Sequence, residues 1–126
     1  MVRKAINAEG TLSVGPYSPA VEAGNTIYLS AQTPVVPETG KLVEGGITVQ
    51  TEQVFQNMFN ILSAAGLSAD HVVKVTVYLT DMGNFTAMNS VYAKQFKPPH
   101  PARTTVGVRE LPLGALVVME LIAIRQ

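Results

Sequence analysis

Two apolar runs near the C-terminal end constrain the fold of this chain more than any other part. Residues 101–108 and 115–124 each have the composition of a β-strand, and turn-forming residues separate them. Side chains alternate across a strand, so Glu120 lies among aliphatic residues on its own face, and the opposite face is aliphatic as well. Such a carboxylate must be protonated, hydrogen-bonded or paired, because burying an unpaired charge costs roughly several kcal/mol.

Arg103 is the partner that a simple hairpin would give to Glu120. If the two runs pair antiparallel around their turn, these residues oppose each other and project from one face. The pair would then be either a structural salt bridge or a site for an anion. In the second interpretation, the guanidinium group binds a planar carboxylate through two parallel hydrogen bonds, and Glu120 holds a water molecule. The spacing alone leaves both interpretations open.

The rest of the chain predicts a regular series of strands and helices. Gly24-Asn25 is a two-residue turn typical of a β-hairpin, Thr48 is the expected N-cap of the first helix, and Gly66 is its expected end. The expected elements are strands at 20–23 and 26–30, a helix at 48–65, a strand at 71–79, a helix whose apolar stripe runs from 85 to 96, and the hairpin arms at 101–108 and 115–124.

This order of elements predicts an α+β fold in a single domain that covers residues 1–126. One mixed sheet with two helices packed on one of its faces satisfies the pattern. The other face would stay uncovered, so we expect a second subunit to pack against it. The composition points the same way, because the chain is 47% hydrophobic and only 14% charged.

Charge and composition also exclude several classes of function. Nine basic and nine acidic residues give a net charge of zero, so the chain offers no excess of positive charge for nucleic acid. The absence of cysteine excludes disulfides and thiol nucleophiles, and no two histidines have the spacing of metal ligands. We find no signal-peptide pattern and no apolar run long enough to cross a bilayer, so we expect a cytoplasmic protein that needs no metal.

Four further polar residues are candidates for a binding site, each with a structural alternative. Asn89 interrupts the apolar stripe of the second helix and either bonds to nearby backbone or borders the Arg103 cleft. Tyr17 stands between two prolines and either packs on the surface or closes a small pocket. Ser30 ends a strand, and Thr105 follows Arg103 by two residues and shares its face; structural roles are common for both.

A set of short motifs runs through nearly the whole chain in a fixed order. In sequence they are Gly15-Pro16-Tyr17-Ser18, Ser30-Ala31-Gln32, Thr39-Gly40, Ala64-Ala65-Gly66-Leu67, Val73-Lys74-Val75-Thr76-Val77, Asn84-Phe85, Asn89, Tyr92, Pro101-Ala102-Arg103, Leu111-Pro112 and Glu120. The colinear set closely resembles the RidA family of reactive intermediate deaminases, also called the YjgF/YER057c/UK114 family.

This resemblance implies a chorismate-mutase-like fold that assembles as a homotrimer, with the sheets forming a central barrel and ligand clefts between subunits. The family hydrolyses 2-aminoacrylate and similar enamines or imines to 2-oxo acids and ammonia without a cofactor. The implied activity is that of a 2-iminobutanoate/2-iminopropanoate deaminase. The implied partner is a small molecule that carries a carboxylate.

The resemblance also implies roles for individual residues. Arg103 matches the arginine that binds the substrate carboxylate, and Glu120 matches the glutamate that positions the hydrolytic water. Residues that match ligand-contacting positions in the cleft are Tyr17, Ser30 and Asn89. Thr105 stands where a cysteine is common, and its backbone amide would still contact the ligand; Ala31 replaces a usual glycine.

Two other functions compete with the deaminase. The chain could be a non-catalytic member of the fold that binds small molecules or regulates a partner through the same cleft. It could also be an endoribonuclease or translation inhibitor, an activity attributed to some relatives, although the zero net charge argues against RNA binding.

Overall fold

The structure is a computed structural model that describes residues 2–8 and 15–126. The strands in this part of the chain are β1 (Lys4–Ile6), β2 (Ala20–Ala23), β3 (Thr26–Gln32), β4 (Val35–Val36), β5 (Lys41–Leu42), β6 (Val72–Leu79), β7 (Ala102–Gly107) and β8 (Val117–Ile124). The α-helices are α1 (Ile47–Ala64) and α2 (Phe85–Tyr92), and short 3-10 turns precede β6, α2 and β8.

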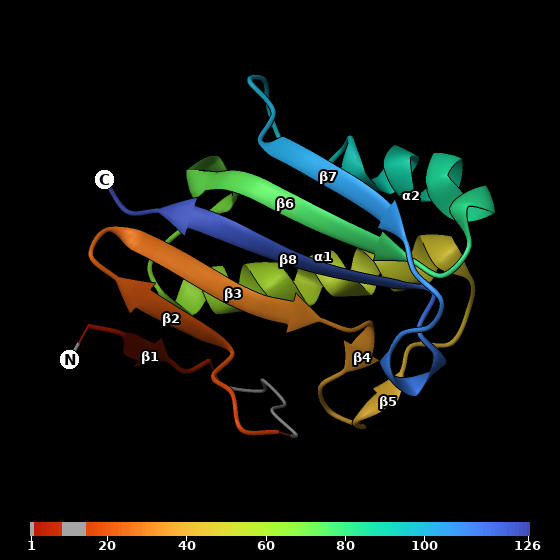
Figure 1. The fold of residues 1–126 in the computed structure, drawn as a ribbon, viewed down its shortest axis with the longest axis horizontal. Helices are drawn as coiled ribbons and strands as arrows, with labels where there is room; N and C mark the ends of the chain where they lie inside the picture. Colours follow the sequence, from red (N-terminus) through yellow and green to blue (C-terminus); the bar gives the residue numbers. More distant parts are fainter. Residues whose placement is uncertain (1, 9–14) are drawn as a thin grey trace.

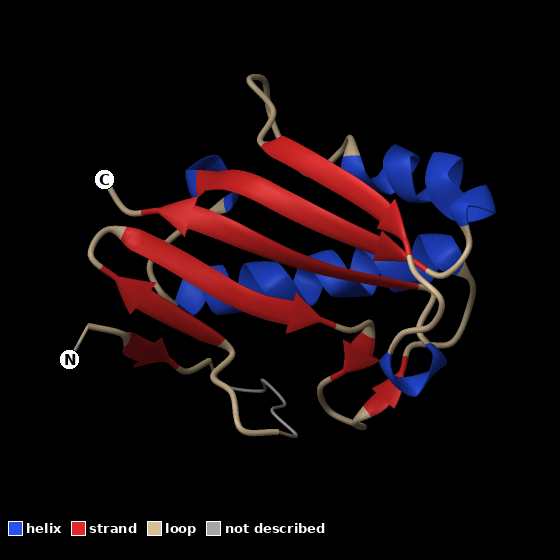
Figure 2. Cartoon of the chain, viewed as in Figure 1, coloured by secondary structure: helices blue, strands red, loops and turns tan. Residues whose placement is uncertain are grey.

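The main sheet has six strands in the order β1-β2-β3-β8-β6-β7, and β4 and β5 form a separate small hairpin. All neighbours in the main sheet are antiparallel except β6 and β7, which are parallel. Both α-helices lie behind the sheet as seen in Figure 1, and neither lies in front of it (Figure 2). The predicted α+β architecture, a mixed sheet with two helices on one face, is therefore confirmed.

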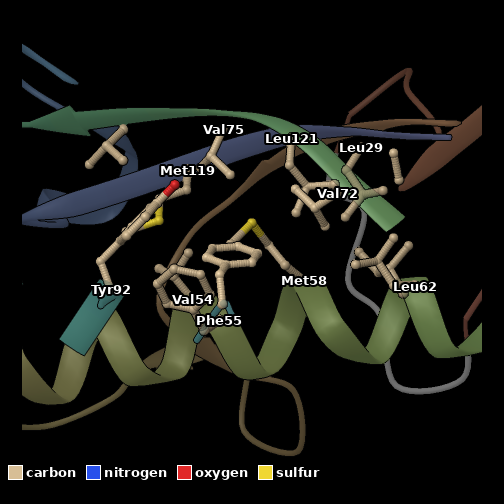
Figure 3. Close-up of a cluster of buried hydrophobic side chains, with 14 of the residues drawn as sticks. Leu29, Val54, Phe55, Met58, Leu62, Val72, Val75, Tyr92, Met119 and Leu121 are labelled. Atoms are coloured by element: carbon tan, nitrogen blue, oxygen red, sulfur yellow. The ribbon is translucent and has the colours of Figure 1, made fainter. Parts of the chain in front are cut away.

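The helix-covered face of the sheet forms the hydrophobic core. Figure 3 shows the side chains of α1, with Phe55 and Met58 at its centre, packed against strands β3, β6 and β8. Phe55, Met58 and Met119 are each at most 2% exposed. Burial of these large apolar groups supplies the main stabilisation of the fold, at about 25 cal/mol per Å² removed from water.

Local signals placed most elements correctly. The predicted hairpin turns at Gly24, which has a φ of 60°, and α1 ends before Gly66, which has a φ of 76°. The predicted N-cap was wrong: α1 begins at Ile47, the capping residue is Gly46 without a side-chain hydrogen bond, and Thr48 lies exposed in the first turn.

The predicted C-terminal hairpin was also wrong. β7 pairs with β6, in parallel, and β8 lies on the other side of β6, between β6 and β3. The physical reason is that α2 connects β6 to β7 as a crossover, and such a connection leaves its two strands parallel and adjacent. The loop after β7 then passes the end of β6, where Val108 N–H donates to the Leu79 carbonyl.

A charged cluster joins the last strand to the far end of the helix layer. Arg125 donates from Nε to Glu22 Oε2 at 2.8 Å and from Nη1 to the Ala65 carbonyl at 2.9 Å. These contacts connect β2, the residue after β8 and the C-terminal end of α1. The hydrogen bond from Arg125, with its positive charge, lowers the pKa of Glu22 below its ordinary value of 4.5.

We predict that Glu22→Gln lowers the free energy of unfolding at neutral pH but not in acid. A carboxyl group whose pKa is lowered by folding stabilises the protein above its unfolded pKa of 4.5, and this stabilisation is lost as the pH falls through the folded value. Urea unfolding of the wild type and the variant, at one protein concentration across this pH range, measures the difference. An equal difference at every pH would contradict the prediction.

Candidate functional site

Arg103 lies on the edge strand β7 and projects toward the helices. Its register partner on β6 is Val75, which is 0% exposed on the core face, and parallel partners share a face. The guanidinium group stacks against an aromatic ring of α2, with Cζ 4.6 Å from the centroid of Tyr92. Arg103 Nη1 donates a hydrogen bond of 2.7 Å to Asn89 Oδ1. The helix therefore fixes the orientation of the arginine through one amide and one aromatic face.

Most of the donors on Arg103 remain available to a ligand. Within residues 2–8 and 15–126, its one hydrogen bond is the bond to Asn89, and the one ion pair joins Arg125 to Glu22. A guanidinium group carries five N–H donors. The pocket beside it has a volume of about 410 Å³ and is lined by Asn89, Tyr92, Ala93, His100, Pro101 and Arg103. This geometry suits a small molecule with a carboxylate.

Glu120 lies on the other face of the sheet. Its register partner on β6 is Thr76, which follows Val75 and so projects away from the helices. The carboxylate accepts a short hydrogen bond from the hydroxyl of Tyr78, and Lys74 and Thr76 line the same shallow depression of about 280 Å³. Glu120 is partly exposed on a face that α1 and α2 leave open.

The expectation that Arg103 and Glu120 are cross-strand neighbours was therefore wrong. Strand β6 separates their strands, and their side chains project from opposite faces of the sheet. A single ligand cannot contact both side chains of the same chain through a packed sheet.

Three of the remaining predicted site residues lie near Arg103 or Glu120. Asn89 contacts Arg103 directly, and Thr105, two residues along β7, shares its face. Ser30 lies where the register of β3 shifts opposite Glu120, and its hydroxyl donates to the Ser18 carbonyl at 2.7 Å, next to the half-exposed Tyr17. We call Arg103, Asn89 and Thr105 the arginine group, and Glu120 and Ser30 the glutamate group; Tyr17 is assigned to neither.

Sequence reasoning missed two tyrosines of the site. Tyr78 contacts Glu120, and alternation along β6 from Val75 to Leu79 places it on the open face, but only knowledge that β6 pairs with β8 brings the two together. Tyr92 was assigned to the apolar stripe of the second helix, whereas its ring also supports Arg103. Burial raises the pKa of Tyr92, and its hydroxyl has no hydrogen-bond partner among the described residues.

In the described part of the chain, no three histidine, cysteine or acidic side chains are grouped so that they could hold a metal ion. No helix there combines the length and apolar character that spanning a bilayer requires.

Comparison with known proteins identifies the family. A family model described as Endoribonuclease L-PSP matches residues 8–125, and the chain belongs to this family, the YjgF/RidA family. A RutC family protein of Pyrococcus horikoshii is 48% identical over 113 residues, which cover 90% of this chain and 90% of that protein. Reactive Intermediate Deaminase A of Arabidopsis thaliana, a chloroplastic protein, is 46% identical over 88% of this chain and 59% of its own length.

Solved structures agree with the sequence relatives. The crystal structure of Escherichia coli TdcF with bound serine superimposes with a TM-score of 0.92 at 33% identity, and the match covers 98% of this chain and 99% of that chain. The predicted family membership is thus confirmed.

We predict that Tyr92→Phe leaves the free energy of unfolding unchanged or raises it by up to about 1 kcal/mol, because the lost hydroxyl is buried without a partner. Tyr92→Leu is the matched control and should destabilise, since it removes ring contacts with Phe55 and Phe96 at 5.5 and 5.4 Å. Thermal and urea unfolding of both variants test this. A clear loss of stability in Tyr92→Phe would show that the hydroxyl has a partner in solution.

Proposed function

We propose that this protein hydrolyses reactive enamines and imines, such as 2-aminoacrylate, 2-iminobutanoate and 2-iminopropanoate, to 2-oxo acids and ammonia in the cytoplasm. The observation that carries the proposal is the Arg103 guanidinium group, which Asn89 and Tyr92 hold in place and no carboxylate of the described residues neutralises. The deaminase named among the relatives supports the same class of reaction.

The chemistry requires little of the protein. The enamine tautomerises to an imine, whose carbon accepts water, and loss of ammonia leaves the 2-oxo acid. Arg103 binds the carboxylate and fixes the reacting carbon. Glu120 orients the water, accepts its proton as the C–O bond forms, and returns this proton to the nitrogen, which leaves as ammonia when the C–N bond breaks. No step needs a redox group or a metal ion.

We place the two groups of residues on neighbouring subunits of a homotrimer. Because Arg103 and Glu120 project from opposite faces of one sheet, one cleft can contain both only when two chains meet. The open face favours such contact, since it carries Tyr28, which is 46% exposed, and Val106, which is 38% exposed. Each subunit would then supply Arg103 to one cleft and Glu120 to the next.

We predict that Arg103→Ala abolishes deaminase activity while the trimer persists. The variant removes the group that binds the substrate carboxylate, whereas the edge position of β7 keeps the core intact. Pyruvate release from enzymatically generated 2-aminoacrylate measures the activity, and size-exclusion chromatography with light scattering measures the assembly. Arg3→Ala, at an exposed arginine, is the matched control and should retain full activity. Normal turnover by Arg103→Ala would refute the proposal.

A mixing experiment tests the shared cleft. Arg103→Ala is expected to be inactive and Glu120→Gln to keep only a small residual activity, but trimers assembled from both chains contain some clefts with both groups intact. In a cyclic trimer each mixed assembly holds one such cleft out of three, so the mixed trimers should show about one third of the wild-type activity. Co-expression with two affinity tags and purification on both isolates the mixed trimers. A cleft built from one chain would give no recovery.

A binding protein without catalysis is the second candidate, and the serine in the TdcF structure favours it. Binding of a 2-oxo acid that depends on Arg103, without faster pyruvate release, would establish this alternative.

The family description also names an endoribonuclease, but the net charge of zero argues against RNA as a ligand. Undetectable or salt-insensitive RNA binding would exclude it.

A further inference from the structure

The open face of the sheet carries a tyrosine–glutamate pair, Tyr78 and Glu120, that is separate from the arginine group. Tyr78 on β6 opposes Val118 on β8, and Thr76 opposes Glu120, so Tyr78 and Glu120 are diagonal neighbours on one face. The Tyr78 hydroxyl donates a short hydrogen bond to Glu120 Oε1. The side chain of Tyr78, on β6, therefore restrains the Glu120 carboxylate on the neighbouring strand β8.

No cation performs this task. Lys74 projects from the same face, but its Nζ donates to Thr104 Oγ1 at 2.8 Å. Within the described ranges, the one salt bridge is that of Arg125 with Glu22, and the one hydrogen-bond partner of the Glu120 side chain is Tyr78. The group that orients the carboxylate is thus a neutral donor.

A single neutral donor has a defined chemical effect. An ionised carboxylate has two oxygens that accept hydrogen bonds, and Tyr78 occupies Oε1, so Oε2 stays available. The hydrogen bond to Glu120, together with burial, raises the pKa of Tyr78, so the phenol keeps its proton at neutral pH and remains a donor. A salt bridge would instead compete with the water for the negative charge.

We propose that Tyr78 is a positioning residue that holds Glu120 so that its second carboxylate oxygen faces the hydrolytic water. This inference rests on the proposed function, because it assigns the Glu120 side chain a water to orient. Tyr78 itself touches neither the substrate nor the water. It acts by restricting the rotation of Glu120 and by leaving its charge uncompensated.

Tyr78→Phe tests the inference, since it removes one hydroxyl and keeps the ring. A hydrogen bond to a charged group is worth enough to predict a fall in kcat of about 10-fold or more. KM should stay within about twofold, because the carboxylate of the substrate is bound by Arg103. If the role of Tyr78 were merely structural, the variant would lose stability, or its kcat would fall while its KM rose.

A double-mutant cycle identifies the partner through which Tyr78 acts. If Tyr78 works through Glu120, adding Tyr78→Phe to Glu120→Gln should change kcat by less than about twofold. Arg3→Ala, at an exposed arginine outside both groups, is the control and should keep wild-type kcat.

The outcomes separate this inference from the proposed function. An active wild type with unchanged kcat in Tyr78→Phe would overturn the role of Tyr78 alone, and so would equal losses in the presence and absence of Glu120. An inactive wild type would overturn both.

Ultraviolet titration of the tyrosines examines the hydrogen bond between Tyr78 and Glu120 without turnover. Glu120→Gln should let one tyrosine ionise at lower pH, and an unchanged titration would contradict the inference.

Discussion

Strand β8 hydrogen-bonds to β3 on one side and to β6 on the other, and this central position determines where both charged side chains of the proposed site lie. Its core-facing residues, among them Met119 and Leu121, are at most 2% exposed, so the register of the strand cannot shift by one residue without placing Glu120 in the core. The packing of the helices thus fixes Glu120 on the open face. The same sheet keeps Arg103 on the other side, because β7 takes its register from β6.

The arginine group follows from the edge position of β7. A guanidinium group at the rim of the core can lie over the ring of Tyr92 while it keeps N–H groups available for hydrogen bonds. Asn89 satisfies one donor without adding a negative charge. The remaining donors have no carboxylate within the described protein, and an anionic ligand would supply the missing countercharge at little cost in reorganisation.

Local sequence signals predicted much of this fold, and long-range pairing accounts for the rest. The glycine turn at Gly24 and the periodicity of α1 each reflect a rule that acts over a few residues, and both were correct. Alternation along β6 holds from Val75 to Leu79 but fails at the start of the strand, because a register shift between Val72 and Lys74 buries Val72 and leaves Val73 45% exposed. The C-terminal pairing failed because neighbouring runs were assumed to be partners. The strand–helix–strand order of β6, α2 and β7 already indicated a parallel pair, which leaves β8 to pair elsewhere.

In the candidate site, too, local signals identified individual residues, whereas long-range strand pairing determined how these residues are arranged. The residue types at Arg103, Asn89 and Glu120 were identified from polar interruptions in apolar patterns, and the contact between Arg103 and Asn89 bears out one of those interpretations. The relation between Arg103 and Glu120 could not be read from spacing, because it depends on which strand separates them. Tyr78 carried no local signal, since a tyrosine on an open sheet face is ordinary until its cross-strand partner is known.

A cleft shared between chains links assembly to chemistry. In the proposed trimer, an isolated subunit would hold Arg103 without a water-orienting carboxylate and Glu120 without a substrate, so the separated chain could complete neither half of the reaction. A ligand that contacts both groups binds the assembled form better than the separate chains, and by mass action it must also stabilise the assembly. The apolar open face and the uncompensated guanidinium group of Arg103 are then both needed to form a complete cleft in the proposed trimer. In this proposal the first brings a second chain to the sheet, and the second binds the molecule that would lie between the two chains.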